Sequence, residues 1–128
     1  MRIVQACRKL GLEFVCVHTA EDIHSGHVRI AKELGGEKSL YQVSSYHDAN
    51  EILSVADDAG ATAIHPGYGF LAENASFAKL CKKYGIAFVG PSGELIDRMG
   101  DKDAARRLMK ASGVPIIPGS GILENVDE

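Results

Sequence analysis

Residues 65–74, with the sequence HPGYGFLAEN, combine the residue types that a ligand-binding turn needs. Gly67 and Gly69 reach positive φ at little cost and let the backbone approach a ligand closely, because glycine has no Cβ. Tyr68, between them, could place its ring over a flat ligand. Glu73 and Asn74 stand where the next helix is expected to begin, and an acidic side chain there complements the helix dipole. The alternative is a purely structural strand-to-helix turn, in which the glycines only avoid steric clashes. The spacing alone does not distinguish a ligand-binding turn from a structural one.

Strand and helix patterns alternate on both sides of this run. The expected strands are short and rich in β-favouring or apolar residues: 12–18, 61–64 and 86–89. The expected helices have apolar residues at helical spacing: 2–10, 27–34, 47–59, 74–84, 93–98 and 102–112. This alternation predicts an α/β fold, a three-layer parallel sheet with helices on both faces. Ligands of such open sheets bind beyond the carboxyl ends of strands, which is where residues 65–74 are expected.

The helix expected over 74–84 places Phe77, Leu80, Cys81 and Tyr84 on one face, at i, i+3, i+4 and i+7. We therefore expect these four side chains to pack into the core.

Composition excludes several classes of function. An apolar fraction of 45% and a charged fraction of 24% are those of a soluble globular protein. No apolar run approaches the roughly 18 residues of a membrane span, and the start has no secretion signal. A net charge of −3 supplies no basic field for nucleic acid. Cys7, Cys16 and Cys81 form no paired motif, so we expect buried thiols in a reducing compartment, the cytoplasm.

Other candidate sites fail on spacing. Residues 35–39 (GGEKS) lack the spacing of a phosphate-binding loop. His24 and His27 are three apart, yet no third ligand follows at metal spacing, so no metal site is expected.

Four blocks of the chain resemble the biotin carboxylases, the ATP-grasp ligases of biotin-dependent carboxylases. They occur in the family's order and spacing: 2–11 (RIVQACRKLG), 65–74, 88–92 (FVGPS) with 99–102 (MGDK), and 112–115 (SGVP) with 118–119 (PG). The resemblance implies a Rossmann-like, pre-ATP-grasp fold. It predicts a biotin carboxylase N-terminal domain over residues 1–98 and the beginning of the ATP-grasp domain over residues 99–128.

The resemblance also implies an activity, the ATP- and bicarbonate-dependent carboxylation of biotin on a carrier protein. ATP, Mg²⁺ or Mn²⁺, and biotin would be the cofactors, and the biotin carboxyl carrier protein and a carboxyltransferase the partners. Lys102 matches the family's ATP-binding lysine, Tyr68 and Gly69 match biotin-side contacts, and Glu73 a carboxylate of the cleft. No catalytic residue and no metal ligand is expected within this chain.

The chain departs from the family pattern at several points. The opening strand and its Asn-Arg-Gly-Glu turn are missing, which predicts a truncated chain or an alternative start. Residues 34–38 are too glycine-rich and polar for the buried strand expected next. Gln5 and Lys9 stand on the subunit-pairing helix where Arg and Glu are usual, so the resemblance leaves a homodimer open. The second ATP lysine, the metal ligands and the catalytic groups would follow residue 128, and we expect these residues alone to be inactive.

Two other functions stay open. Other ATP-grasp ligases, such as purine-synthesis or carbamoyl-phosphate enzymes, share the fold but lack the HPGYG motif. A non-catalytic, degenerate module would keep the fold without binding ATP.

Overall fold

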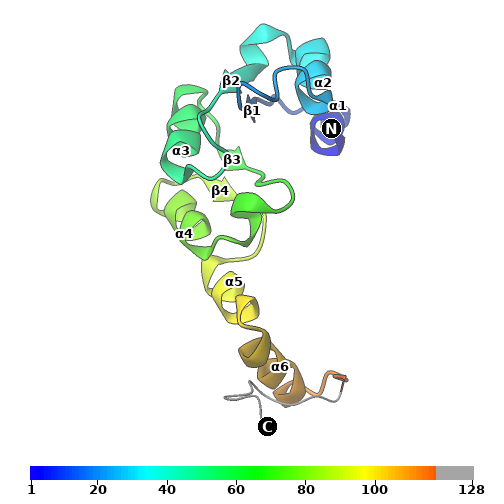
Figure 1. Ribbon diagram of the computed structural model, residues 1–128, viewed down its shortest axis with the longest axis vertical. Helices are drawn as coiled ribbons and strands as arrows, with labels where there is room; N and C mark the ends of the chain where they lie inside the picture. The colour runs from blue at the N-terminus through cyan, green and yellow to red at the C-terminus, as the bar shows by residue number, and fades with distance from the viewer. Residues whose placement is uncertain (118–128) are drawn as a thin grey trace.

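The computed structural model describes residues 1–117, and these alternate between helices and short strands (Figure 1). The amino-terminal half consists of α1 (Arg2–Leu10), β1 (Cys16–His18), α2 (Gly26–Gly35), the 3-10 helix η1 (Glu37–Ser39), β2 (Leu40–Gln42) and α3 (Ala49–Asp58). The rest consists of β3 (Ala63–Ile64), the 3-10 helix η2 (Phe70–Glu73), α4 (Ala75–Lys83), β4 (Ala87–Phe88), α5 (Gly93–Gly100) and α6 (Lys102–Ala111). The predicted α/β class is confirmed.

Local sequence signals define most helix ends. Gly11 ends α1 with φ 67°, a left-handed cap that glycine adopts without strain. The side chain of Asp48 accepts hydrogen bonds from the N–H groups of Asn50 and Glu51 at the start of α3. Ser92 caps α5 in the same way, through the N–H of Leu95. These ends agree with the helix boundaries predicted from the sequence to within a few residues.

The strands are parallel, as predicted, but they form two separate pairs. β1 pairs with β2, with Cys16 opposite Leu40, and β3 pairs with β4, with Ala63 opposite Ala87. Within residues 1–117 no ladder joins the two pairs. Down the view of Figure 1 the strands follow in the order β2, β1, β3, β4. The prediction that the family's first strand is absent remains a prediction.

Two strand predictions need correction. The strand expected over 12–18 is limited to Cys16–His18, because residues 11–15 form the connection out of α1. No strand was expected after residues 34–38, yet β2 follows at Leu40–Gln42. The glycines of that segment instead end α2 and precede η1, and β2 begins only where the polar stretch is over.

The core is divided between the two strand pairs. Leu53, Leu71, Phe77 and Cys81 are buried together beside β3 and β4. The other buried apolar side chains belong mainly to the half with β1 and β2: Val4, Val28, Ala31 and Val43.

Tyr84 is the exception among the four side chains predicted for the buried face of α4. Phe77 and Cys81 are buried and Leu80 packs against them, but Tyr84 is 65% exposed. Its residue is the cap that ends α4, so the backbone leaves the helical path there and carries the ring outward.

Helices α5 and α6 extend away from the strands (Figure 1). α5 packs on α4 and then on α6. The domain boundary predicted between residues 98 and 99 falls inside α5 and stays a prediction. No helix within residues 1–117 has both the length and the apolarity to cross a membrane.

Candidate functional site

Residues 65–74 form the turn predicted between β3 and α4. His65 Nδ1 accepts a hydrogen bond of 3.1 Å from the N–H of Gly67, whose φ is 73°. Gly69 has φ 75° and ψ −157°, a combination that is nearly exclusive to glycine. The glycines are thus required by the backbone path, as the sequence indicated, and His65 stabilises the turn.

The end of the turn differs from the prediction. Glu73 and Asn74 were both expected to open the helix, but Glu73 ends the 3-10 helix η2. Asn74 alone caps α4, and its Oδ1 accepts a hydrogen bond of 2.9 Å from the N–H of Phe77. Asparagine is favoured at this position because its side-chain oxygen accepts a hydrogen bond from a free N–H group in the first turn of the helix.

Tyr68 projects from the tip of the turn into solvent. It is 98% exposed, the highest exposure among the large hydrophobic side chains of residues 1–117. Burying an aromatic ring is favourable, and a ring with no packing partner is available to a ligand. The position is compatible with the biotin-side contact predicted from the resemblance, which stays a prediction.

Phe70 is a feature of this site that the sequence did not indicate. Its φ is 45°, and it is the only residue other than glycine with positive φ in the described part of the chain. A bulky residue in this conformation is strained, and such strain concentrates at functional sites. Its ring packs at a centroid distance of 5.5 Å from Tyr46 and 4.9 Å from His47. These contacts hold η2 against the segment that follows β2.

Tyr46 joins the carboxyl ends of three strands. Its hydroxyl donates a hydrogen bond of 2.6 Å to Asp22 Oδ2 and accepts one of 3.4 Å from the N–H of Thr19, directly after β1. Its ring packs on Phe70, beyond β3. Partial burial, together with the hydrogen bond to Asp22, raises the pKa of Tyr46. The sequence did not indicate these contacts, because the partners of Tyr46 are distant along the chain.

Replacing Tyr46 with phenylalanine is expected to lower the free energy of unfolding by about 1 kcal/mol, the typical value of one hydrogen bond. The unmodified chain should also lose stability as the pH rises above about 10, because the unfolded phenol ionises before the folded one. Below that pH both states are protonated and the contribution is complete. Urea unfolding at several pH values would measure both effects. Identical pH profiles for the variant and the parent would contradict the role of the hydroxyl.

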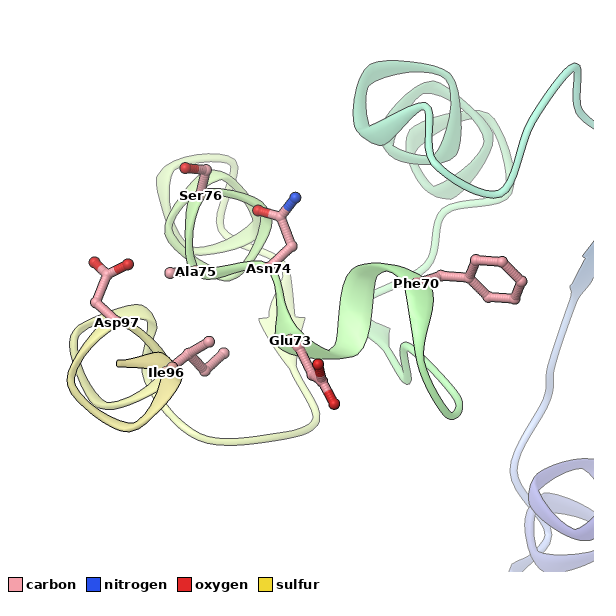
Figure 2. Close-up of a pocket in the computed structure, with 8 residues that line it drawn as sticks. Phe70, Glu73, Asn74, Ala75, Ser76, Ile96 and Asp97 are labelled. Atoms are coloured by element: carbon pink, nitrogen blue, oxygen red, sulfur yellow. The ribbon is translucent and has the colours of Figure 1, made fainter. Parts of the chain in front are cut away.

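A shallow pocket of about 400 Å³ lies between the turn and α5 (Figure 2). Glu73 lines it from η2 and Ile96 faces it from α5, while the Phe70 ring points away from α5. Eight residues line it: Phe70, Glu73, Asn74, Ala75, Ser76, Ile96, Asp97 and Gly100. The ion pairs within residues 1–117 leave Glu73 out, whereas Asp97 is paired with Lys79. The pocket therefore presents one uncompensated carboxylate.

Lys102 lies apart from the turn. It is the first residue of α6, behind Asp101, whose side chain accepts hydrogen bonds from the N–H groups of Asp103 and Ala104. Its side chain is exposed, and α6 lies beyond α5 in Figure 1. The structure does not bring Lys102 together with Tyr68. It does place Lys102 two residues after Gly100, which lines the pocket beside Glu73.

Metal and thiol chemistry receive no support from the described residues. No group of three His, Cys, Asp or Glu side chains within residues 1–117 is placed to hold a metal ion. The three cysteines are free, and burial raises the pKa of Cys16 and Cys81, which keeps these thiols protonated. Cys81 is buried as predicted, whereas Cys7 and Cys16 are only half-buried.

Comparison with known protein families gives a match over most of the chain. Residues 1–96 match the family model described as "Biotin carboxylase, N-terminal domain". Biotin carboxylase 1 of Bacillus subtilis (strain 168) is 51% identical over 129 residues, covering 100% of this chain and 29% of that protein. The 2-oxoglutarate carboxylase small subunit of Hydrogenobacter thermophilus is 43% identical, over 99% of this chain and 27% of that protein.

Solved structures agree with these relatives. The biotin carboxylase domain of a single-chain bacterial carboxylase matches with a TM-score of 0.86 and 40% identity, over 98% of this chain and 29% of that one. The biotin carboxylase domain dimer of Hydrogenobacter thermophilus 2-oxoglutarate carboxylase, in complex with MgADP, ADP and bicarbonate, matches with a TM-score of 0.86 and 41% identity. That match covers 98% of this chain and 28% of the solved one. The chain thus spans less than a third of the length of these relatives.

Proposed function

This chain belongs to the biotin carboxylase family, and we propose that it forms one wall of a cleft in which biotin on a carrier protein is carboxylated at the expense of ATP and bicarbonate. One observation carries the proposal: the turn after β3 exposes Tyr68 and places Glu73 in the lining of a pocket at the carboxyl ends of parallel strands. Ligands of open α/β sheets bind at this edge. A related domain has been solved with MgADP and bicarbonate.

The charge of the pocket favours biotin over nucleotide as its neighbour. The unpaired carboxylate of Glu73 repels phosphate groups and accepts hydrogen bonds from N–H donors. The ureido ring of biotin is flat and carries two N–H groups, which suits Glu73 and an aromatic ring such as Tyr68. We therefore assign Tyr68, Gly69 and Glu73 to the biotin side.

Lys102 is assigned to ATP, as its match to the family's lysine implies. Its ammonium would pair with phosphate oxygens from outside the pocket, where α6 begins. ATP supplies the phosphoryl group that activates bicarbonate. Because residues 1–117 contain no group of three His, Cys, Asp or Glu side chains placed to hold a metal ion, no step through Mg²⁺ is assigned to them. We expect the 128 residues alone not to hydrolyse ATP.

The same proposal includes the partner proteins of this chain and its location in the cell. A biotin carboxyl carrier protein and a carboxyltransferase would complete the reaction, in the cytoplasm. A homodimer is also proposed, since the solved relative is a dimer. The exposed side chains of Gln5 and Lys9 on α1 would then replace the family's usual pairing residues.

A chimera tests the proposal: residues 1–128 replace the matching segment of Bacillus subtilis biotin carboxylase 1. We expect the chimera to hydrolyse ATP in a biotin- and bicarbonate-dependent manner, and the isolated chain not to do so. Lys102→Met should raise the KM for ATP by roughly 10-fold or more, because the variant loses one charge-assisted hydrogen bond to the phosphates. Lys110→Met, which removes an exposed ammonium from the same helix, is the matched control and should leave KM unchanged.

Each alternative function has its own outcome in this experiment. An inactive chimera beside an active Bacillus subtilis parent would identify the segment as a degenerate module. ATP hydrolysis that responds to acceptors other than biotin would identify another ligase. Equal effects of Lys102→Met and Lys110→Met would remove Lys102 from the nucleotide site.

A further inference from the structure

Two side chains of η2 attach the turn of residues 65–74 to the rest of the chain. Leu71 is buried in the core cluster beside β3 and β4. The ring of Phe70, directly before it, packs on Tyr46 and His47, which lie outside that cluster. A segment that is fixed at one point can rotate about it, whereas a second fixed point sets its direction. The contacts of Phe70 therefore bear on how η2 is oriented.

The two glycines beside Tyr68 give the tip of the turn little support. A Cβ at Gly67 or at Gly69 would meet no atom within 4 Å, so the space beside both residues is open. The hydrogen bond from the N–H of Gly67 to His65 Nδ1 lies within the turn itself. Phe70 is thus the first side chain after Tyr68 that contacts a distant segment. What holds Phe70 also holds the carboxyl side of the tip.

Tyr46 is fixed at both ends of its side chain. Its hydroxyl donates a hydrogen bond of 2.6 Å to Asp22 Oδ2 and accepts one of 3.4 Å from the N–H of Thr19. Its ring lies at a centroid distance of 5.5 Å from that of Phe70. His47, the other ring on Phe70, is exposed, and its ring makes no hydrogen bond within residues 1–117. Tyr46 is therefore the firmer of the two supports.

The backbone of Phe70 needs such a support. Its φ of 45° lies in the left-handed region, which a bulky residue avoids. A residue stays in this conformation when the surrounding structure over-determines it. A loss of the ring contacts would favour a return to negative φ, and that rotation would turn η2 on its buried neighbour Leu71.

We propose that Tyr46 is a positioning residue for the carboxylation: through Phe70 it sets the orientation of η2, and with it the places of Tyr68 and Glu73 beside biotin. Phe70 begins η2 and Glu73 ends it (Figure 2), so one rotation moves Glu73 and the tip of the turn together. The role toward biotin rests on the proposed function, whereas the hold on η2 does not. Lys102, at the start of α6, is not attached to this segment, so the site assigned to ATP should not respond.

Kinetics of the chimera separate positioning from stability. Tyr46→Ala should lower kcat/KM for free biotin by about 10-fold, because a misplacement of roughly 1 Å far from the chemistry can cost up to about 100-fold. The KM for ATP should not change. Tyr46→Phe keeps the ring without its hydrogen bonds and should fall between this variant and the parent. The matched control is Tyr41→Ala, which removes a half-buried tyrosine of β2 that has no ring contact with the turn and should leave both parameters unchanged.

Phe70→Gly tests the route of the effect. Glycine adopts a φ of 45° at little cost but offers Tyr46 no ring to hold. The variant should lose as much biotin efficiency as Tyr46→Ala. The double variant should be no worse than either single variant, because effects that pass through one contact are not additive.

Hydrogen exchange of the full chain, labelled with ¹⁵N, examines the hold on η2 without any assay of activity. The N–H of Ala72 donates to the carbonyl of Gly69 at 2.8 Å, and the N–H of Asn74 donates to the carbonyl of Leu71 at 3.1 Å. Tyr46→Ala should accelerate exchange at these two amides by about 10-fold relative to the amides of α4, since the opening of η2 becomes easier. Tyr41→Ala should not.

Three outcomes would overturn the proposal: equal effects of Tyr46→Ala on the biotin and ATP parameters, additive effects of Tyr46→Ala and Phe70→Gly, or unchanged exchange at Ala72 and Asn74. An inactive parent chimera would mean something different. It would remove the proposed carboxylation and the role toward biotin with it, while the exchange rates would still decide whether Tyr46 holds η2.

Discussion

Replacing Gly69 with alanine in the chimera is expected to reduce biotin-dependent ATP hydrolysis by about 100-fold, the cost of a misplaced substrate contact. With φ 75° and ψ −157°, this position accepts glycine and penalises any residue with a Cβ by about 1–3 kcal/mol. The backbone would relieve that strain by rotating, and rotation at Gly69 moves Tyr68 and η2 together. Steady-state kinetics with free biotin and bicarbonate would measure the loss.

Gly36 supplies the matched control. It has φ 75° and ψ −178°, and a Cβ at either glycine would meet no atom within 4 Å. Gly36→Ala therefore carries a similar backbone cost but lies between α2 and η1, away from the turn. We expect a comparable loss of stability with activity within a few-fold of the parent. Equal losses of activity in both variants would show that the Gly69 effect is one of stability alone.

Replacing Phe77 with alanine is expected to lower the free energy of unfolding by about 3–5 kcal/mol. Phe77 is 1% exposed and among the largest fully buried side chains within residues 1–117. Its ring packs edge-on against Phe88 of β4 at a centroid distance of 6.0 Å, so the substitution removes contacts from both α4 and a strand. A loss of this size is a large part of the roughly 5–15 kcal/mol that stabilises a typical domain. The midpoint of urea denaturation would report it.

Tyr84 is the control on the same helix. It lies on the face that the spacing assigned to the core, yet it is 65% exposed. Tyr84→Ala should change the free energy of unfolding by no more than about 0.5 kcal/mol, the usual range for surface positions. If the two variants lost equal stability, the core of α4 would extend further than the structure shows.

The turn of residues 65–74 could be predicted from the sequence because its conformation depends on local chemistry. Glycine permits positive φ at positions 67 and 69, and Asn74 caps the next helix whatever the rest of the chain does. The helix ends at Gly11 and Asp48 were predictable for the same reason. Membership in the biotin carboxylase family could likewise be read from the order and spacing of such local motifs.

The second half of that turn and the pocket beside it could not be predicted in this way. Phe70 has positive φ, and its ring packs on Tyr46 and His47, which lie more than 20 residues earlier in the chain. The pocket beside Glu73 exists only where α5 returns to α4. β2 was missed because three residues carry too weak a pattern, and its strand conformation depends on pairing with β1.

By itself, the sequence determined the class of fold, the family, most helix ends and the positive φ of Gly67 and Gly69 in the turn, all of which depend on groups within a few residues of one another. Only the tertiary structure decided that the parallel strands form two separate pairs, that Tyr46 joins their carboxyl ends, and that Lys102 lies apart from Tyr68. These features depend on contacts between distant segments. Their free energy comes from burial and pairing that no local pattern encodes.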